Sequence, residues 1–535
     1  IYIIFIQNRQ SSMKIDNMTI IDKIREVKSK FPNKTAIIDL KNNTEATFSQ
    51  IDTQSEAVYN YLKKNNFSKG DKVVLFVPIS LKFYIILIGI LKMGMQVVFI
   101  DPYAKINHIN KCCEMISPNA IIGSKKVLFL GNFLKEIRKI PIKIDYKNIL
   151  KDSKYHEISD DYEISKDTPA LISFTSGSTG FPKIIMRTHG FLLGQHNVLD
   201  KNIQFSENTQ AYSSFPMFLL SHICTGTTTL IPDINFGKPI KTDVKSVVKQ
   251  IESKNIENII LPPSILENIV RFSKKNNIKL DCVQRVFTGG APVFPKLMYN
   301  LLEIFPKSKV RALYGASEVE PISIFNFETI TKKQIESMKN GAGLFVGKKV
   351  DQIDLKIERL ELEENLKLNE KNLKKYSKSD FEKIQQILKK SAGEILVKGE
   401  NVLKNYLNVK SDPNKEWHET GDMGYINENN ELFLLGRAKG RVKIKNSIYY
   451  PLSIETAFSF CKEVKKCALI SKNEELYMII EKEDNYTRTI LENKEIKKLC
   501  EKFNISQVIE KKIPLDKRHN SKIDYNKLEK LIEKL

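Results

Sequence analysis

A loop rich in small hydroxyls and glycines follows an apolar, strand-like run at Leu171–Phe174. Such a loop brings backbone N–H groups and hydroxyls close to a polyanion, because glycine removes the Cβ where the chain turns tightly. A lysine at its end adds the positive charge that attracts phosphate oxygens. The candidate phosphate-binding residues are Thr175, Ser176, Gly177, Ser178, Thr179, Gly180 and Lys183.

The spacing of this loop differs from that of the common nucleotide P-loop. Lys183 follows Phe181-Pro182 instead of a glycine, and no Ser or Thr comes directly after it. A solvated Ser/Gly turn would explain the loop by itself. The joint occurrence of a strand, the Thr-Ser-Gly-Ser-Thr-Gly run, a proline and a lysine favours a phosphate site instead.

An aromatic ring, a hydroxyl and a carboxylate lie close together in the run Tyr314-Gly315-Ala316-Ser317-Glu318. Mg²⁺ is a hard cation that takes few carboxylates and leaves its other positions to phosphate oxygens and water. Glu318 is therefore the candidate metal ligand. If this motif stood alone, a surface carboxylate that caps a helix would be the preferred interpretation of Glu318.

Further candidates follow predicted strands or close the chain. The turn after Val286–Thr288 exposes backbone at the carboxyl edge of a sheet, where α/β folds bind ligands. The carboxylate of a Thr-Gly-Asp turn at 420–422 offers two oxygens that can accept two donors. These candidates, with two later cations, are Gly289, Gly290, Ala291, Pro292, Asp422, Arg437 and Lys522.

The motifs and their order resemble the signature of the adenylate-forming superfamily, which includes acyl-CoA synthetases, luciferases and peptide-synthetase adenylation domains. The resemblance covers nearly the whole chain and implies that the 175–183 loop holds the β- and γ-phosphates of ATP. The 289–292 turn would lie against the adenine and the acyl carboxylate. Tyr314 would stack on the adenine, Ser317 would bond the α-phosphate and Glu318 would hold Mg²⁺.

The same resemblance gives roles to the later candidates. Asp422 would accept both ribose hydroxyls, and Arg437 would contact that ribose or the α-phosphate. Lys522 would swing into the site and bond the acyl carboxylate and the α-phosphate, where a charge-assisted bond is worth more in the transition state than before it. A catalytically silent nucleotide-binding scaffold is the rival from another class, and the intact polar candidates argue against it.

The implied reaction joins a carboxylate to Mg·ATP and gives an acyl-adenylate and pyrophosphate. The carboxylate is itself the nucleophile, so positioning and charge neutralisation suffice for catalysis. The branch resembles the fatty-acyl activating enzymes that include the β-lactone synthetases of olefin biosynthesis, which implies a fatty or β-hydroxy fatty acid substrate. A fatty acyl-CoA ligase and a ligase that loads an acyl carrier protein remain alternatives. Asn446 replaces the glycine that lets the pantetheine arm pass, which argues against CoA.

An apolar segment, Phe215–Leu219, follows the phosphate loop. Leu219 stands where many acyl-CoA synthetases carry a histidine, so we expect a more apolar acyl pocket, with ordinary core as an equal alternative. His222 lies nearby, but a lone histidine beside an apolar run is more often a satisfied buried residue than a catalyst.

The net charge of +22 on this 535-residue chain comes from lysines spread along its whole length, without the aromatic interleaving of a nucleic-acid surface. We therefore expect no nucleic-acid partner. Seven scattered cysteines fit a reducing cytoplasm better than a disulfide framework. The most apolar region, Val73–Ile100, carries Lys82 and Lys92 too close together to leave a membrane span.

The order of predicted elements indicates an α/β fold. Val73–Val77 has the continuous apolar run of a parallel strand, Phe83–Lys92 the pattern of a helix, and Val97–Ile100 that of the next strand. Thr35–Asp39 and 46–49 are expected as short strands, with Ser49 or Asp52 as the cap of the helix that follows.

We predict a large N-terminal domain of mostly parallel sheets flanked by helices, at residues 19–436, and a small α+β lid domain at 437–535. Residues 1–18 are expected to be a non-native or disordered start. The charged segment at about 359–392 has helix-like spacing and is expected to be a helical insertion. Lys439 would lie at the hinge between the two domains.

Overall fold

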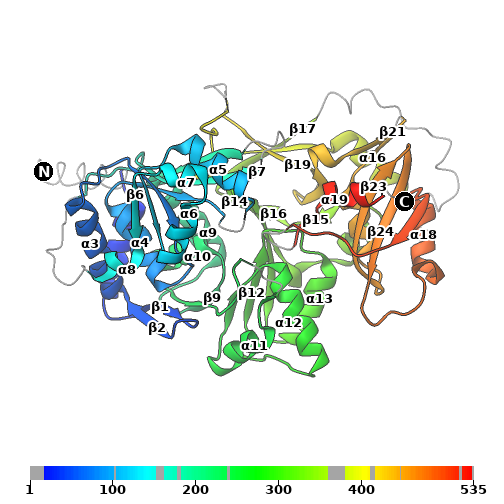
Figure 1. The fold of residues 1–535 in the computed structure, drawn as a ribbon. Helices are drawn as coiled ribbons and strands as arrows, with labels where there is room; N and C mark the ends of the chain where they lie inside the picture. The colour runs from blue at the N-terminus through cyan, green and yellow to red at the C-terminus, as the bar shows by residue number, and fades with distance from the viewer. Residues whose placement is uncertain are drawn as a thin grey trace, which may run out of the picture.

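The computed structural model describes residues 17–101, 104–151, 162–176, 182–237, 241–359, 380–409, 416–445, 447–516 and 521–532. Within these ranges the chain forms sheets of nine, six and five strands, followed by two small sheets near the C-terminus (Figure 1). The predicted α/β class, with mostly parallel sheets flanked by helices, is confirmed.

The helices of the large N-terminal part are α2 (Ile20–Lys30), α3 (Phe48–Lys64), α4 (Leu81–Lys92), α5 (Ile106–Ile116), α6 (Lys125–Gly131), α7 (Lys135–Lys139), α8 (Tyr146–Lys151), α9 (His189–Ile203), α10 (Pro216–Thr225), α11 (Val244–Ser253), α12 (Pro263–Lys275), α13 (Pro295–Ile304), α14 (Lys332–Lys339) and α16 (Asp380–Ser391). Those of the C-terminal part are α17 (Pro451–Phe458), α18 (Lys494–Lys502) and α19 (Tyr525–Ile532). Among the residues described, no helix is both long and apolar enough to cross a membrane.

The six-stranded sheet contains the predicted β-α-β unit. Its strands, in spatial order, are β6 (Ile142–Asp145), β5 (Ala120–Gly123), β3 (Lys72–Phe76), β4 (Gln96–Phe99), β7 (Pro169–Ser176) and β8 (Pro182–Thr188). Neighbouring strands are parallel except β7 and β8, which form an antiparallel hairpin. Strands β3 and β4 and helix α4 coincide with the predicted elements to within two residues at each end.

The nine-stranded sheet is also mostly parallel. Its order is β16 (Lys348–Lys349), β14 (Val319–Asn326), β13 (Lys309–Ala316), β12 (Arg285–Gly289), β11 (Asn258–Ile260), β9 (Gln210–Ser213), β10 (Thr228–Ile231), β1 (Thr35–Asp39) and β2 (Thr44–Thr47). The run from β13 to β1 is parallel, and the outer strands are antiparallel.

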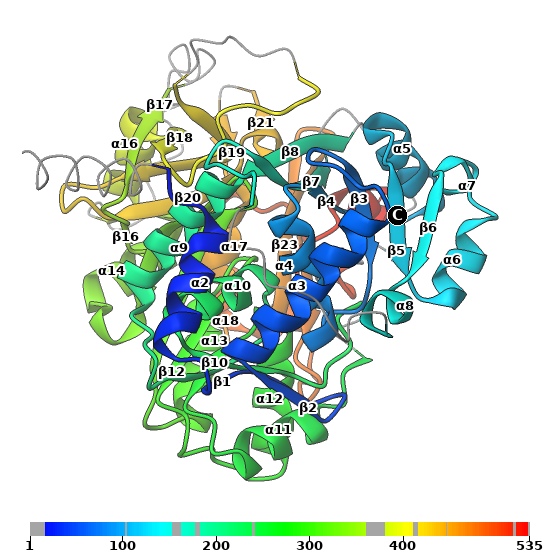
Figure 2. The ribbon, with the colours of Figure 1, turned by 90° about the vertical axis from the view of Figure 1, so that its left-hand side faces the viewer.

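One core joins the two large sheets. It includes Ile37 of the nine-stranded sheet, Val73 of the six-stranded sheet, and the buried faces of α2, α3, α4 and α10. Figure 2 shows α2, α3 and α4 side by side on this part of the molecule. Helix α4 is buried except at Lys82, which explains why its sequence is apolar on every face.

The start of α3 corrects one expectation. Its N-cap is Thr47, which forms a capping box with Gln50: the Gln50 N–H donates to Thr47 Oγ1 and the Thr47 N–H donates to Gln50 Oε1. Ser49 and Asp52, the predicted caps, lie inside the helix. The predicted strand at 46–49 accordingly ends at Thr47, in β2.

The five-stranded sheet is antiparallel throughout. Its order is β15 (Leu344–Phe345), β20 (Leu432–Arg437), β19 (His418–Ile426), β18 (Gly393–Gly399) and β17 (Ile353–Glu358). The predicted charged insertion connects β17 to β18, where Glu358 pairs with Glu394. Its last part is α16, and residues 360–379 lie outside the described ranges.

The C-terminal part has its own sheets and its own core. Strands β21 (Val442–Ile444) and β22 (Ser447–Tyr449) pair with each other, and β23 (Val464–Lys472), β24 (Glu475–Lys482) and β25 (Gln507–Glu510) form a three-stranded sheet. A buried cluster between Ile454 and Phe503 packs α17 and α18 on that sheet. The domain boundary at 436/437 stays a prediction.

Candidate functional site

The predicted phosphate loop is the turn of the β7–β8 hairpin. Thr175 pairs with Lys183 and Ser176 pairs with Pro182, so the strands bring both ends of the loop together. Gly177, Ser178, Thr179 and Gly180 lie outside the described residues. The ammonium nitrogen of Lys183 lies 4.4 Å from the ring centroid of Tyr406, within the range of a cation–π contact.

Tyr406 also contacts the candidate metal ligand. Its hydroxyl donates a hydrogen bond of 2.8 Å to Glu318 Oε1. Burial, and secondly the neighbouring Glu318 carboxylate, raise the pKa of Tyr406, so this hydroxyl stays protonated and acts as a donor at neutral pH. One ring therefore separates the Lys183 cation from the Glu318 carboxylate.

Arg187 of β8 holds the backbone beside Glu318. Its guanidinium donates to the Ser317 carbonyl oxygen (2.6 Å) and to Ser173 Oγ (3.0 Å). Arg187 is buried, which lowers its pKa, and Glu320 and Glu318 oppose this effect. The predicted α-phosphate ligand, Ser317, is exposed on the turn that Arg187 fixes.

A second polar network links the nine-stranded and five-stranded sheets. The Tyr314 hydroxyl, at the end of β13, donates 2.9 Å to Asp422 Oδ2. Asp422 of β19 and Arg437 of β20 are direct cross-strand partners, and Arg437 Nε lies 3.3 Å from Asp422 Oδ1. Burial raises the pKa of Asp422, whereas Arg437, the bond from Tyr314 and the charge of Lys522 lower it.

The predicted glycine turn lies at the carboxyl end of β12. A Cβ on Gly289 would come within 2.6 Å of the Leu313 carbonyl oxygen, so only glycine allows β12 and β13 to approach this closely. Gly290 has a φ of +81°, the left-handed region that glycine adopts without strain. Ala291 and Pro292 follow it, and the Phe215 ring packs against Gly290.

Lys522 lies in a short loop that returns to the site from the C-terminal part. Its backbone N–H donates to Asp516 Oδ1 (2.9 Å), and its carbonyl oxygen accepts from the Asp516 N–H (2.8 Å). The Lys522 side chain is exposed, and its charge lowers the pKa of Asp422. Lys522 is therefore within electrostatic reach of the Tyr314–Asp422–Arg437 network.

The sequence implies a magnesium ion, and the carboxylates near Glu318 determine whether one could be held. Across the described ranges, no three His, Cys, Asp or Glu side chains cluster in a geometry that could hold a metal alone. Mg²⁺ bound to nucleotide needs only one or two carboxylates, since phosphate oxygens and water complete its octahedron. The Glu318 carboxylate, nearly buried and oriented by Tyr406, fits that requirement.

Tyr406 and Arg187 are the two site residues that the sequence analysis missed. Tyr406 belongs to a segment, 402–408, that is hydrogen-bonded both to the β7–β8 hairpin and to the turn that carries Glu318. The Leu403 N–H donates to the Glu318 carbonyl oxygen, and the Leu407 N–H donates to that of Ile184. No spacing rule marks this segment, because its partners lie far away in the sequence.

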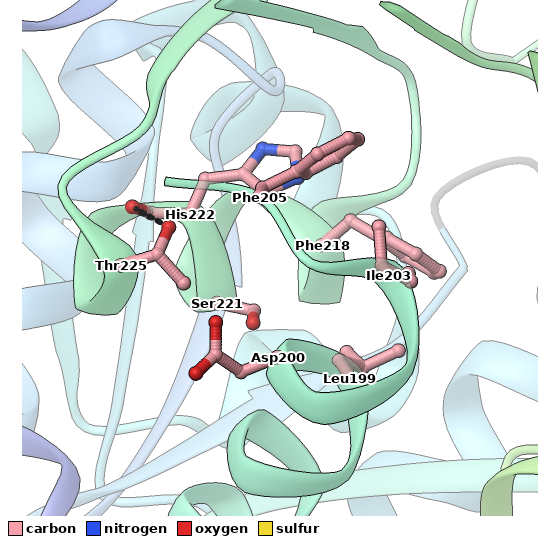
Figure 3. A pocket seen from close by; sticks show the side chains of 8 residues that line it. All are labelled: Leu199, Asp200, Ile203, Phe205, Phe218, Ser221, His222 and Thr225. Atoms are coloured by element: carbon pink, nitrogen blue, oxygen red, sulfur yellow. Dashed lines mark hydrogen bonds between the residues drawn. The ribbon is translucent and has the colours of Figure 1, made fainter. Parts of the chain in front are cut away.

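A small pocket lies between α9 and α10 (Figure 3). Its lining residues are Leu199, Asp200, Ile203, Phe205, Phe218, Ser221, His222 and Thr225. His222 is buried, shares a 2.9 Å hydrogen bond with Thr229 Oγ1, and has its pKa lowered by burial to about 3. His222 is a neutral buried residue, but it is not fully satisfied as expected, because its Nε2 has no hydrogen-bond partner among the described residues. Leu219 belongs to the core.

The comparisons with known proteins agree with this architecture. The sequence pattern of the AMP-binding enzymes matches residues 24–407, which is most of the chain. The chain therefore belongs to the AMP-binding enzyme family, the class of AMP-forming acid ligases that the resemblance implied.

Similar proteins carry different names within this class. A 4-coumarate-CoA ligase from Narcissus pseudonarcissus is 23% identical over 82% of this chain and 79% of its own length. An olefin beta-lactone synthetase from Stenotrophomonas maltophilia is 22% identical over 79% of this chain and 78% of its own. The fold matches that of O-succinylbenzoate coenzyme A synthetase from Bacillus subtilis, which was solved with ATP and magnesium ion. The TM-score is 0.73 at 18% identity, and the match covers 96% of this chain and 100% of that one.

Proposed function

We propose that this enzyme uses ATP to convert a fatty or β-hydroxy fatty acid into its acyl-adenylate, with release of pyrophosphate. One observation carries the proposal: the end of β13 and the turn that leads into β14 contribute to two polar networks. Tyr314 joins Asp422 and Arg437, and Glu318, four residues later, joins Tyr406 and Lys183. A nucleotide laid along this turn has its ribose end at one network and its phosphates at the other.

The residues of the first network suit a nucleoside. The Asp422 carboxylate has two oxygens for the two ribose hydroxyls, and its hydrogen bond from Tyr314 fixes its orientation. The Tyr314 ring packs against the adenine in this proposal. Arg437 compensates the charge of Asp422 and donates toward the ribose or the α-phosphate.

The residues of the second network suit phosphates. Lys183 and the hydroxyls of the 175–180 loop neutralise the β- and γ-phosphates, and Ser317 donates to the α-phosphate. A magnesium ion held by Glu318 would supply charge neutralisation at the phosphates. Lys522 bonds the acyl carboxylate and the α-phosphate, so its charge acts where negative charge develops. The 289–292 turn supports the adenine and the acyl carboxylate.

The substrate class rests on the likeness to olefin beta-lactone synthetases and on the apolar surroundings of Phe215 beside Gly290. The 4-coumarate-CoA ligases are about as similar, and they favour transfer of the acyl group to CoA as the second candidate. Loading of an acyl carrier protein is the third. Asn446, the residue that argues against CoA, lies outside the described residues.

The test measures acid-dependent release of AMP and pyrophosphate with fatty acids, β-hydroxy fatty acids and 4-coumarate, each with and without CoA. Turnover of β-hydroxy acids without CoA, with a lactone as product, supports the β-lactone outcome. A strict requirement for CoA assigns the protein to the acyl-CoA ligases. If the protein binds ATP but releases no AMP with any of these acids, a catalytically silent nucleotide-binding scaffold becomes the better assignment.

A further inference from the structure

Three large apolar side chains project into solvent at the end of α6. Phe129 is 63% exposed, Leu130 is 53% exposed and Phe133 is 75% exposed. The two phenyl rings contact each other edge to face, with centroids 5.6 Å apart. Ile142, at the start of the neighbouring strand β6, is 39% exposed. We call these four residues the α6 apolar patch.

The patch is held in place by packing and hydrogen bonds. The Phe133 N–H donates to the Leu130 carbonyl oxygen, and the Leu134 N–H donates to that of Gly131. A Cβ on Gly131 would lie 2.8 Å from the Ile137 side chain, so the chain turns tightly against α7 here. The exposed rings are therefore a fixed feature of a folded turn.

Cations are frequent in the segment that carries the α6 apolar patch. Residues 125–151 carry eight Lys and Arg side chains against two carboxylates, a net charge of +6. Both carboxylates, Glu136 and Asp145, are buried, whereas every cation except the half-buried Lys143 is exposed. Lys143 donates to Asn132 Oδ1 (2.6 Å), which places its charge at the turn between Phe129 and Phe133.

The patch lies at the outer edge of the molecule. Strand β6 is the edge strand of the six-stranded sheet, and the phosphate hairpin β7–β8 forms the opposite edge. Figure 2 shows α6, α7 and β6 together at one side of the molecule, and Figure 1 shows them on the opposite side from the C-terminal part. A partner bound there would leave the candidate active site accessible.

The chemistry of the patch limits its partner. In a symmetric contact with a second copy, these cations would face one another, and three or four side chains are too few for a stable dimer interface. Nucleic acid would use flat aromatic faces in a groove, whereas this surface is a projecting turn that includes Leu130 and Ile142. Exposed apolar side chains in a segment rich in exposed cations match an anionic bilayer surface, which offers both hydrocarbon and negative charge.

We propose that the α6 apolar patch binds the surface of anionic lipid membranes. Phe129, Leu130 and Phe133 insert into the boundary between headgroups and acyl chains, and exposed lysines of residues 125–151 contact the acidic headgroups. This inference rests on the surface alone and is independent of the proposed reaction.

The experiment measures co-sedimentation of the full chain with vesicles of phosphatidylcholine alone and with about 30% phosphatidylserine. We expect binding only to the anionic vesicles, and weaker binding as salt is raised, because charge contributes to it. The variant Phe129→Ser/Phe133→Ser should lose about tenfold or more of the vesicle affinity. Lys125→Ser/Lys126→Ser should also weaken binding to the anionic vesicles and make it less sensitive to salt. The matched control is Leu491→Ser, which removes an exposed leucine elsewhere on the chain.

Three outcomes would overturn the proposal. They are no sedimentation with either vesicle, equal vesicle binding by the Phe129→Ser/Phe133→Ser variant, and equal loss in the Leu491→Ser control. The same proteins are examined by gel filtration and with a labelled single-stranded oligonucleotide. The wild type could instead fail to bind vesicles but form a dimer or an oligonucleotide complex that the Phe129→Ser/Phe133→Ser variant does not form. That result would assign the patch to a second copy or to nucleic acid.

Discussion

Tyr406 contacts both Lys183 and Glu318, so one aromatic side chain sets the separation of a cation and a carboxylate. Tyr406→Phe keeps the ring and removes only the hydrogen bond to Glu318. We expect the rate of acid-dependent AMP release to fall about tenfold, since a hydrogen bond to a charged group contributes about 1.5–3 kcal/mol.

The Tyr406→Ala variant separates the two contacts. It also removes the ring beneath Lys183, so we expect a larger loss and a weaker affinity for ATP. Tyr299→Phe, on the surface of α13, is the control and should leave the rate unchanged. Full activity of Tyr406→Phe would show that Glu318 does not depend on this hydrogen bond.

Lys522 provides the sharpest separation of binding from chemistry. Lys522→Ala should reduce acid-dependent AMP release by about 100-fold or more, because one charge-stabilising contact contributes about 2.7–4 kcal/mol in the transition state. ATP affinity, measured by calorimetry, should stay nearly unchanged. Lys530→Ala, an exposed lysine on the following helix, is the matched control. Retained adenylation in Lys522→Ala would contradict the role given to this loop.

The candidate site could be predicted from the sequence where residue type and local order carry the information. Tyr314, Glu318, Asp422 and Arg437 were identified in this way, and the structure brings the members of each pair, Tyr314 with Asp422 and Asp422 with Arg437, into contact. Tyr406 could not be found, because its position follows from long-range pairing of the 402–408 segment with two distant strands.

At the scale of elements, helices α3 and α4 share a buried ion cluster. The ammonium group of Lys92 is fully buried and lies 2.8 Å from Asp52 Oδ1 and 3.0 Å from Glu56 Oε2. Burial alone would raise the pKa of Asp52, but Lys92 and Lys28 lower it. The cluster explains why a lysine occurs in an otherwise apolar helix.

Removing Lys92 takes an ion-pair partner from both buried carboxylates, although Asp52 keeps its 3.1 Å ion pair with Lys28. We expect Lys92→Met to lower the free energy of unfolding by about 3–5 kcal/mol, measured by urea unfolding followed by circular dichroism. The combined variant Lys92→Met/Asp52→Asn/Glu56→Gln should recover much of this loss. The control is Lys64→Met, at an exposed position near the end of α3. A small effect of Lys92→Met would mean that water reaches the cluster.

Glu455 fastens the last helix to the C-terminal part. The Tyr525 hydroxyl donates to Glu455 Oε1 (2.5 Å), as does the Leu469 N–H (2.9 Å). Burial raises the pKa of Glu455 from 4.5 to about 7, although both of these bonds oppose the rise. Glu455 is therefore protonated in the folded chain over a range where it is ionised in the unfolded chain.

This difference predicts the sign of a pH effect. The stability that protonated Glu455 contributes is complete below pH 4.5 and is lost as the pH rises toward about 7. Relative to Glu455→Gln, the wild-type free energy of unfolding should fall by about 3 kcal/mol across this range, at about 1.36 kcal/mol per pKa unit. Denaturation at pH 5 and pH 7.5 measures it, with Glu529→Gln as the exposed control. Parallel pH curves for wild type and Glu455→Gln would contradict the assignment.

The elements themselves were predictable where one local rule dominates. Strand β3, helix α4 and strand β4 have continuous apolar runs, with Gly94 between α4 and β4, and their bounds were nearly correct. The start of α3 was misplaced because Thr47, Ser49 and Asp52 can all cap a helix. Of these three residues, Thr47 is the one followed three positions later by a glutamine, Gln50, with which it forms a capping box. The antiparallel five-stranded sheet was not predicted, since its strand order depends on pairings across the whole chain.

At the scale of the molecule, Lys296 ties the C-terminal part to α13. Its ammonium group donates to Glu483 Oε1 (2.7 Å) and to the Val464 carbonyl oxygen (2.7 Å). Reversing this charge with Lys296→Glu should release the C-terminal part and speed trypsin cleavage at residues 439–445 several-fold, because local opening exposes the connection.

The matched control reverses a charge within the large N-terminal part. Lys274→Glu breaks the 2.7 Å ion pair with Glu303, between α12 and α13, without touching the C-terminal part. Gel electrophoresis of timed digests compares the two variants. Equal cleavage rates for wild type and Lys296→Glu would show that this tie does not hold the two parts together. A hinge at Lys439 predicts faster cleavage of Lys296→Glu than of the wild type.

The connection between β17 and β18 has a consequence for engineering. Because Glu358 and Glu394 face each other in an antiparallel pair, the two ends of the intervening segment are already adjacent. Lengthening a connection adds little closure entropy, about 0.6 kcal/mol for each doubling. A fluorescent reporter or a second enzyme inserted in the connection between β17 and β18 would therefore travel with the protein while the Tyr314–Asp422–Arg437 network keeps its register.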